Sequence, residues 1–233
     1  MRRINFEHIA NFRDLGGLPT ASGYACEGKL YRSSMLYNLS KVDQATFESL
    51  NIQTIMDLRS PKEIKNEVNP YKDLVKNYYH FNLSGRAAAG RSSELAKNAK
   101  DKYFMAERYM EYLEQKQELR SLFNVFLQAE AFPLVFHCSA GKDRTGTIAY
   151  LIEKLNQVPL ADIVADYQVS YTYVQADPKI IHPDKGLNIY QSYPEIMQRF
   201  DAYFLDQYGS ITNYFEELGF DSAEIEELSH ILE

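Results

Sequence analysis

The residues whose types and spacing suit chemistry lie between Pro133 and Gly146, where five residues separate Cys138 from Arg144. A cysteine beside cationic groups at a helix N-terminus can have its pKa lowered from about 8.5 to roughly 3.5–7.5, which makes it a thiolate nucleophile at neutral pH. An arginine can donate two parallel hydrogen bonds to a phosphate. The pair therefore predicts attack by Cys138 on a phosphoryl group that Arg144 binds.

The apolar residues on both sides of Cys138 predict the elements that position it. Residues 134–136 form an apolar run typical of a buried strand, and apolar residues recur with helical spacing from Ile148 to Leu155. Cys138 is then expected at a strand-to-helix turn, where free N–H groups and the helix dipole favour an anion. Gly141 would let the backbone approach that anion closely.

The loop after Cys138 is expected to hold the phosphate, mainly through its backbone N–H groups. The residues predicted to bind it are Ser139, Ala140, Gly141, Lys142, Asp143 and Arg144. Lys142 would either recognise a second phosphate on an inositol ring or raise the local potential, and the Thr145 hydroxyl would hydrogen-bond the departing sulfur. A nucleotide-binding P-loop is excluded, because Asp143 stands where such a loop needs a magnesium-binding Ser or Thr.

The run His137-Cys-Ser-Ala-Gly-Lys-Asp-Arg-Thr-Gly146 resembles the loop of bacterial cysteine-dependent tyrosine phosphatases of the atypical dual-specificity type. Three further segments match that family in its order: Asn11-Phe-Arg-Asp-Leu-Gly-Gly17, Leu30-Tyr-Arg-Ser-Ser34 and Met56-Asp-Leu-Arg-Ser60. Four ordered matches are more specific than a Cys-x5-Arg pattern alone. The resemblance implies a phosphatase-like fold, His137 as a supporting residue, and phosphotyrosine proteins or phosphoinositides as substrates.

A phosphatase of this kind also needs a carboxylic acid to protonate the leaving oxygen. Ordinary tyrosine phosphatases take it from a Trp-Pro-Asp loop, but this chain contains no Trp. The Lys-Asp-Arg run of the resembled family makes Asp143 the first candidate, although Asp143 could instead pair with Lys142 or Arg144. Asp57 is second because it ends a predicted strand, at the edge where α/β sheets bind ligands. Asp14 is third, with a bridge to Arg13 as its alternative role.

The expected reaction is therefore hydrolysis of a phosphomonoester in two steps through a phosphocysteine. No cofactor or metal is needed, because Arg144, Lys142 and the backbone supply the positive charge. Two alternatives come from other classes of protein. A rhodanese-like sulfurtransferase also places a cysteine loop before a helix, and a silent phosphate-binding module would bind the anion without turnover.

Composition and charge limit the partners that we expect. The net charge is −7, but the part from Tyr193 onward carries ten acidic residues and Arg199 alone, so residues 1–192 sum to +2. That balance suits an anionic substrate and gives no support to nucleic-acid binding.

No apolar run is long enough to span a membrane. The N-terminus lacks a signal-peptide core, which predicts a cytoplasmic protein unless a leader has been removed. Cys26 and Cys138 argue against a disulfide framework.

The fold expected for residues 1–233 is a single α/β phosphatase domain, with a mostly parallel central sheet of four to five strands flanked by helices and a helical C-terminal part. Strands are expected near residues 29–32, 52–58, 78–83 and 134–136, and loops over 11–17 and 176–188. Ser40 is expected to cap a helix that starts at Val42, and Gly209 and Gly219 are expected to end two C-terminal helices. The segment 85–105 has five basic and two acidic residues, hence +3. It is expected either as a solvated helical insertion or as a lid whose Arg86, Arg91 and Lys97 meet the substrate.

Overall fold

The computed structural model describes residues 2–84, 101, 103–175, 177–181 and 189–233. The predicted lid, with Arg86, Arg91 and Lys97, therefore falls outside the described residues except for its last few positions. Most of the loop expected over residues 176–188 also falls outside them.

Within the described residues, the central sheet has six strands in the order β1-β2-β5-β8-β6-β7. Their bounds are β1 Arg2–Arg3, β2 Arg13–Asp14, β5 Leu30–Ser33, β8 Leu134–His137, β6 Thr54–Asp57 and β7 Asn77–His80. The four longer strands pair in parallel, and the two-residue strands β1 and β2 add an antiparallel edge. The predicted mostly parallel α/β sheet is confirmed. The sheet has six strands where four to five were expected, because the short strands β1 and β2 add to it.

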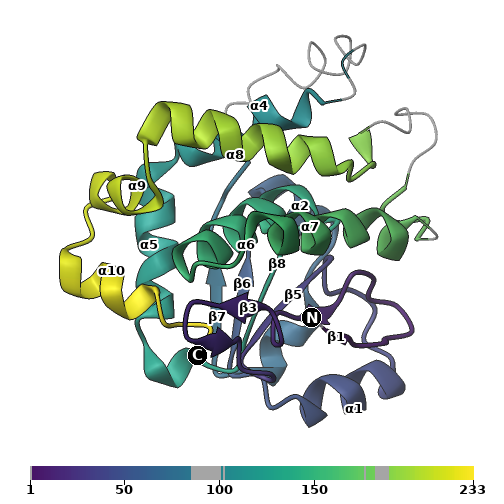
Figure 1. The fold of residues 1–233 in the computed structure, drawn as a ribbon. Coiled ribbons are helices and arrows are strands. Elements are labelled where there is room, and N and C mark those ends of the chain that lie inside the picture. Colours follow the sequence, from purple (N-terminus) through teal and green to yellow (C-terminus); the bar gives the residue numbers. More distant parts are fainter. Residues whose placement is uncertain (1, 85–100, 102, 176, 182–188) are drawn as a thin grey trace.

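Helices cover both faces of this sheet (Figure 1). In the described part of the chain, the α-helices are α1 Lys41–Ser49, α2 Pro61–Asn66, α4 Met105–Leu113, α5 Lys116–Phe126, α6 Asp143–Leu155, α7 Leu160–Val174, α8 Pro194–Tyr208, α9 Ile211–Glu217 and α10 Ser222–Leu228. Short 3-10 turns span Pro70–Leu74 and Ala129–Ala131. Helix α8 packs against α4 and α7 in the upper part of Figure 1.

Alternation along the strands divides the core into two layers. In β6 and β8, Ile55 and Val135 face a smaller cluster that includes Phe47 of α1, whereas Met56 and Phe136 face the larger cluster formed with the other helices. Successive side chains of a strand point to opposite faces, and a parallel sheet is apolar on both. Strand β8, which leads into Cys138, therefore packs against apolar side chains on both faces of the sheet.

One local expectation needs correction, and another is confirmed. Asn11 to Gly17 was expected to be a loop, but its residues Arg13 and Asp14 form β2, because they pair with Arg32 and Tyr31 of β5. A small hairpin of β3, Pro19–Thr20, and β4, Gly23–Tyr24, follows it. The stops expected at Gly209 and Gly219 do end α8 and α9, and Asp221 then caps a further helix, α10, through a capping box.

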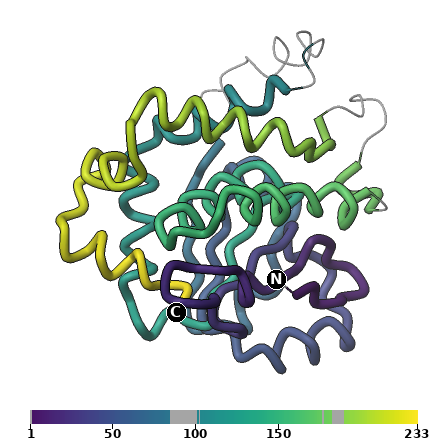
Figure 2. The backbone as a smooth tube through the Cα atoms, in the orientation of Figure 1, coloured from purple at the N-terminus to yellow at the C-terminus, as the bar shows by residue number. Residues whose placement is uncertain are grey.

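The C-terminal end of the chain contacts a loop in the N-terminal part of the chain. The C-terminal end, yellow in Figure 2, reaches the purple N-terminal loop, where the Cys26 N–H donates to the Leu232 carbonyl oxygen at 2.6 Å. Cys26 is exposed, Cys138 is buried, and both are free thiols. Across the described residues, every helix is too short or too polar to cross a lipid bilayer.

Candidate active site

Cys138 directly follows β8 at the carboxyl end of the sheet, and α6 begins five residues later at Asp143. The predicted strand-to-helix turn is therefore present. Gly141 is essential to its path, with φ +66°, and a Cβ there would lie 2.2 Å from the Ser33 carbonyl oxygen. Only glycine fits this approach of the loop to the end of β5. Among the described residues, the N–H groups of residues 139–144 have no protein acceptor.

Arg144 is held by Glu63, a residue that the sequence analysis does not place in the site. Its Nη1 and Nη2 donate to Glu63 Oε2 and Oε1, both at 2.7 Å, in a bidentate pair. Longer contacts reach the Leu58 carbonyl oxygen at 3.3 Å and Ser139 Oγ at 3.4 Å. Its Nε donates to no described acceptor. Arg144 can therefore offer Nε and Nη2 to an oxyanion while Glu63 fixes the guanidinium plane.

A capping box at the start of α2 places Glu63. Ser60 Oγ accepts from the Glu63 N–H at 3.2 Å, and Glu63 Oε2 accepts from the Ser60 N–H at 2.8 Å. Glu63 Oε1 also accepts from Ser139 Oγ at 2.5 Å. Burial opposes ionisation of Glu63, but these bonds and the charge of Arg144 hold its pKa well below the usual range. In the sequence, Ser60-Pro-Lys-Glu63 indicates the start of a helix, but nothing in it indicates that Glu63 contacts Arg144.

We expect Glu63→Gln to lower kcat/KM by roughly tenfold to a hundredfold, because a neutral amide offers one acceptor where Arg144 needs two. A lowered folded-state pKa means that the Glu63–Arg144 pair stabilises the fold at and above the ordinary pKa of 4.5, and loses that contribution as pH falls through the folded value. The difference in urea midpoint between Glu63→Gln and the wild type should therefore be largest near pH 7 and shrink on acidification.

Glu67→Gln is the matched control for this experiment. Glu67 lies one turn along the chain, has the same 35 % side-chain exposure as Glu63, and pairs with Lys179 at 2.9 Å instead of with Arg144. Its substitution should leave kcat/KM unchanged. Equal losses in both variants would contradict a specific role for Glu63.

Asp143 lies beside Arg144 and joins it in lining a cavity of about 680 Å³. Its Oδ1 accepts from the Tyr109 hydroxyl at 2.7 Å and from Lys142 Nζ at 2.5 Å. Its Oδ2 accepts no hydrogen bond from a described residue. The cavity is lined by Ser60, Pro61, Lys62, Glu63, Asn82, Ser84, Arg108, Tyr112, Asp143 and Arg144. One carboxylate oxygen is thus fixed and the other is left for chemistry.

Lys142 points away from the cavity. It is 1 % exposed, and its Nζ lies 5.9 Å from the centre of the Tyr167 ring as well as against Asp143. Burial opposes its charge, but Asp143 raises the Lys142 pKa above the ordinary value, so the side chain stays cationic. This placement disfavours contact with a second phosphate and favours the alternative that Lys142 raises the local potential while orienting Asp143.

Asp57 is fully buried and forms an ion pair with Arg59. It accepts from Arg59 Nη2 at 2.7 Å and from the Tyr78 hydroxyl at 2.8 Å. Although burial opposes ionisation, the hydrogen bonds and charge of Arg59 and the hydrogen bond from Tyr78 hold the pKa of Asp57 well below its usual range. A carboxylate with these partners is a poor proton donor. The arrangement favours a structural role for Asp57 over that of the general acid.

His137 anchors the base of the loop. Its Nδ1–H donates to the Cys138 carbonyl oxygen at 3.2 Å, and its Nε2 lies 3.2 Å from Asn69 Nδ2. Burial lowers the pKa of His137, which favours the neutral ring that these two contacts require. The neighbouring Thr145 hydroxyl is buried and has no hydrogen-bond partner among the described residues.

Asp14 does not reach the loop, and the predicted Arg13–Asp14 bridge is wrong. Asp14 is buried and accepts from the N–H groups of Gly16 at 2.8 Å and Gly28 at 2.7 Å, so it closes a turn. Arg13 instead pairs with Asp166 of α7, Nε to Oδ1 at 2.7 Å. The two side chains point to opposite faces because they are neighbours in β2.

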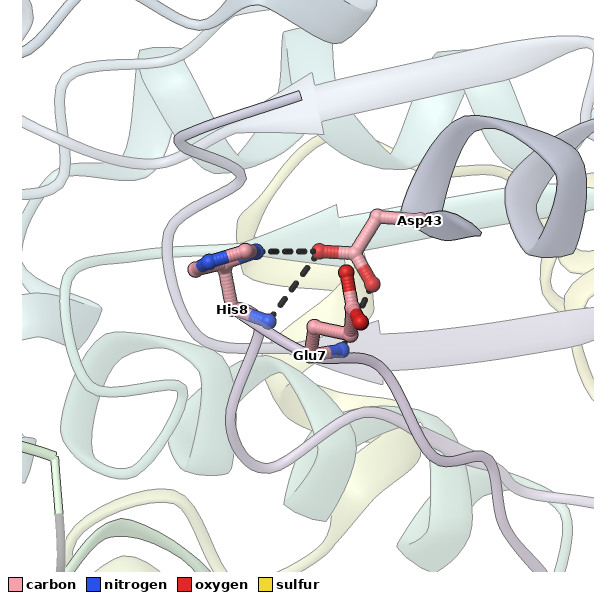
Figure 3. A group of neighbouring side chains, drawn as sticks. All are labelled: Glu7, His8 and Asp43. Atoms are coloured by element: carbon pink, nitrogen blue, oxygen red, sulfur yellow. Dashed lines mark hydrogen bonds and ion pairs between the residues drawn. The ribbon is translucent and has the colours of Figure 1, made fainter. Parts of the chain in front are cut away.

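The described residues contain one group with metal-ligand types in reach of one another: Glu7, His8 and Asp43 (Figure 3). The Asp43 oxygens already accept from the Glu7 N–H at 2.6 Å, the His8 N–H at 3.0 Å and His8 Nδ1 at 3.1 Å. These donors make the cluster a clamp between the N-terminal segment and α1, and it contributes nothing to the loop.

Comparison with known proteins supports the phosphatase interpretation. A model of the tyrosine phosphatase family matches residues 4–233. A candidate tyrosine-protein phosphatase of Cupriavidus necator is 27% identical over 231 residues, which cover 92% of this chain and 83% of that protein. The triple specificity protein phosphatase PtpB of Mycobacterium tuberculosis is 29% identical over 182 residues, 67% of this chain and 65% of PtpB.

Among solved structures, the core catalytic domain of the PP-IP phosphatase Siw14 from S. cerevisiae is similar with a TM-score of 0.42 and 20% identity, over 85% of this chain and 95% of that one. The match of the family model is far broader than the loop, since it takes in nearly the whole sequence. It favours a phosphatase over the sulfurtransferase alternative. The chain belongs to the tyrosine phosphatase family.

Proposed function

We propose that residues 1–233 act as one phosphatase domain that hydrolyses phosphomonoesters without a metal, through a phosphocysteine on Cys138. The observation that carries this proposal is that one loop combines a cysteine, six N–H groups with no acceptor among the described residues, and an arginine fixed by Glu63. Donors preorganised in this way stabilise the charge that develops on a transferring phosphoryl group.

In the first step the Cys138 sulfur attacks phosphorus, the S–P bond forms and the P–O bond to the leaving group breaks. Arg144 and the loop N–H groups hold the three equatorial oxygens. Asp143 Oδ2 accepts no hydrogen bond from a described residue, and Asp143 lines the cavity beside Arg144, so this oxygen gives its proton to the leaving oxygen.

In the second step a water molecule attacks phosphorus and the S–P bond breaks. Asp143, now a carboxylate, takes the proton from that water, so inorganic phosphate leaves and the acid is restored. The buried Thr145 hydroxyl has no described partner and is available to donate to the Cys138 sulfur as it departs as a thiolate.

Phosphotyrosine proteins are the substrate class that we propose first, because the family and the relatives named above are tyrosine phosphatases. The position of Lys142 weakens the argument for recognition of a second phosphate by this residue. Phosphoinositides remain the second class, on the basis of the positive charge of the segment 85–105.

A direct test measures phosphate release from a phosphotyrosyl peptide and from several phosphoinositides in the presence of EDTA. We expect release from the peptide, unaffected by EDTA, with the higher kcat/KM of the two substrate classes. Release that required an added divalent ion would contradict the mechanism. Release from the phosphoinositides alone would reverse the proposed substrate order.

We expect Asp143→Asn to lower kcat by about 10²- to 10³-fold on a phosphate ester with a poor leaving group, and much less on an activated aryl phosphate. Asn cannot give a proton to the leaving oxygen, and only a poor leaving group needs one. Steady-state kinetics with a series of aryl phosphates of rising phenol pKa would measure this dependence.

Asp57→Asn is the control for the acid. It should lower the melting temperature, because Arg59 loses its buried partner, while the dependence of kcat on leaving-group pKa stays that of the wild type. A steeper dependence in Asp57→Asn than in Asp143→Asn would transfer the acid role to Asp57.

A further inference from the structure

A buried polar cluster lies behind the phosphate loop and is not used by the chemistry above. It consists of Asn11, Arg13, Arg32 and Asp166, each at most 1 % exposed. Asn11 and Arg13 come from the N-terminal segment, Arg32 from β5 and Asp166 from α7. These segments are far apart in the sequence, so the fold has assembled the cluster at the back of one loop.

The cluster contacts the loop at two carbonyl oxygens. Asn11 Nδ2 donates to the carbonyl oxygens of Ala140 and Gly141, both at 3.0 Å. Arg32 Nη2 also donates to the Gly141 oxygen at 3.0 Å. Two consecutive peptide groups of the loop therefore have their carbonyl ends tied to buried donors.

Tying a carbonyl fixes the direction of the N–H in the same peptide group. A trans peptide is planar, and its C=O and N–H point in opposite directions. The Ala140 carbonyl shares a plane with the Gly141 N–H, and the Gly141 carbonyl shares a plane with the Lys142 N–H. Because both oxygens are held toward the buried cluster, both N–H groups must face away from it, on the side where a phosphate would lie.

The cluster also fixes the orientation of the Asn11 amide. Arg13 Nη1 donates to Asn11 Oδ1, which leaves the Nδ2 end for the loop carbonyls. Arg13 and Arg32 are both held by Asp166, through its Oδ1 and Oδ2 respectively. Asn11 adopts φ 57°, a left-handed conformation that Asn tolerates better than most residues. Both its backbone and its side chain are thus specified.

We propose that Asn11 is a positioning residue that aims the Gly141 and Lys142 N–H groups at the phosphate, with Arg32 and Asp166 holding it and the loop in register. This inference rests on the proposed function only in taking an oxyanion as the ligand of the loop. It assigns to the Asn-Phe-Arg-Asp segment near the N-terminus a role in binding the transferred group.

The test compares binding of inorganic phosphate, by calorimetry, and kcat/KM on an aryl phosphate in Asn11→Ala, Asn11→Gly and Asn11→Asp. Ala and Gly remove the amide donor, and Gly also accepts the positive φ without strain. Asp places an acceptor against two carbonyl oxygens. We expect phosphate to bind roughly tenfold to a hundredfold more weakly in Asn11→Gly and Asn11→Ala, and more weakly still in Asn11→Asp.

Asn51→Ala is the matched control, because Asn51 has φ 51° but lies beyond the end of α1. It should lose stability through the same backbone strain and keep the phosphate affinity of the wild type. A folded Asn11→Gly that binds phosphate within about twofold of the wild type would overturn the inference. A wild type that binds phosphate in an Asn11-dependent way without turnover would support it and refute the proposed function.

Discussion

Cys138→Ser is expected to reduce turnover by about 10⁵-fold or more, to the background rate, while phosphate still binds. A serine hydroxyl in this position is not ionised near neutral pH, so it is a much weaker nucleophile than a thiolate. The anion-binding groups are unaffected, because Arg144 and the loop N–H groups belong to other residues. Phosphate release and calorimetric binding of inorganic phosphate would measure the two effects separately.

Cys26→Ser is the control for this result, since Cys26 is an exposed free thiol next to the C-terminus. It should retain full activity. Turnover near the wild-type rate in Cys138→Ser would remove the phosphocysteine from the mechanism. Loss of phosphate binding together with turnover would mean that the sulfur itself holds the loop in shape.

Arg144→Lys should lower kcat/KM by about 10²- to 10³-fold, although the charge is retained. The guanidinium can satisfy both oxygens of Glu63 and still present Nε and Nη2 to the phosphate. A lysine ammonium is a single point donor, so it must choose between Glu63 and the phosphate. The loss should appear in kcat as well as in KM, because the equatorial oxygens gain charge in the transition state.

Arg59→Lys provides the comparison for Arg144→Lys. Arg59 is buried, and like Arg144 it has a bidentate carboxylate partner, Asp57, but that pair faces Tyr78 and the carbonyl oxygen of Glu67. Its substitution should lower the melting temperature and leave kcat/KM within a few fold of the wild type. An equal kinetic loss in both variants would show that the effect comes from general destabilisation.

The sequence predicts the secondary structure around the phosphate loop, because this structure depends on residues that are close together in the chain. The apolar run before Cys138 and the helical spacing after it placed the strand, the turn and α6, and the strands of the parallel sheet were found within a few residues of their ends. The Ser40 cap of α1 was also predicted, and its Oγ accepts from the Asp43 N–H at 3.0 Å. Capping and periodicity involve residues a few positions apart, so the sequence displays them directly.

The sequence was less informative where two side chains had to be matched across the fold. It suggested Asp14 as the partner of Arg13, because the two residues are adjacent. The strand geometry of β2 instead turns Arg13 toward Asp166, more than 150 residues later. It also offered Asp57 and Asp143 as acids without separating them, because the burial of Asp57 depends on Arg59 and Tyr78, which only the packed structure brings together.

The sequence by itself determined which residues are available for the proposed chemistry of the loop: a thiol, an arginine six positions on, and a glycine where the backbone turns. These requirements are local, because one short loop must surround one phosphate. The tertiary structure decided how the loop is held, with Glu63 from α2 against Arg144, Tyr109 from α4 against Asp143, and Asn11 behind Gly141. Such contacts depend on the relative placement of distant elements, which burial and packing set and which no local pattern encodes.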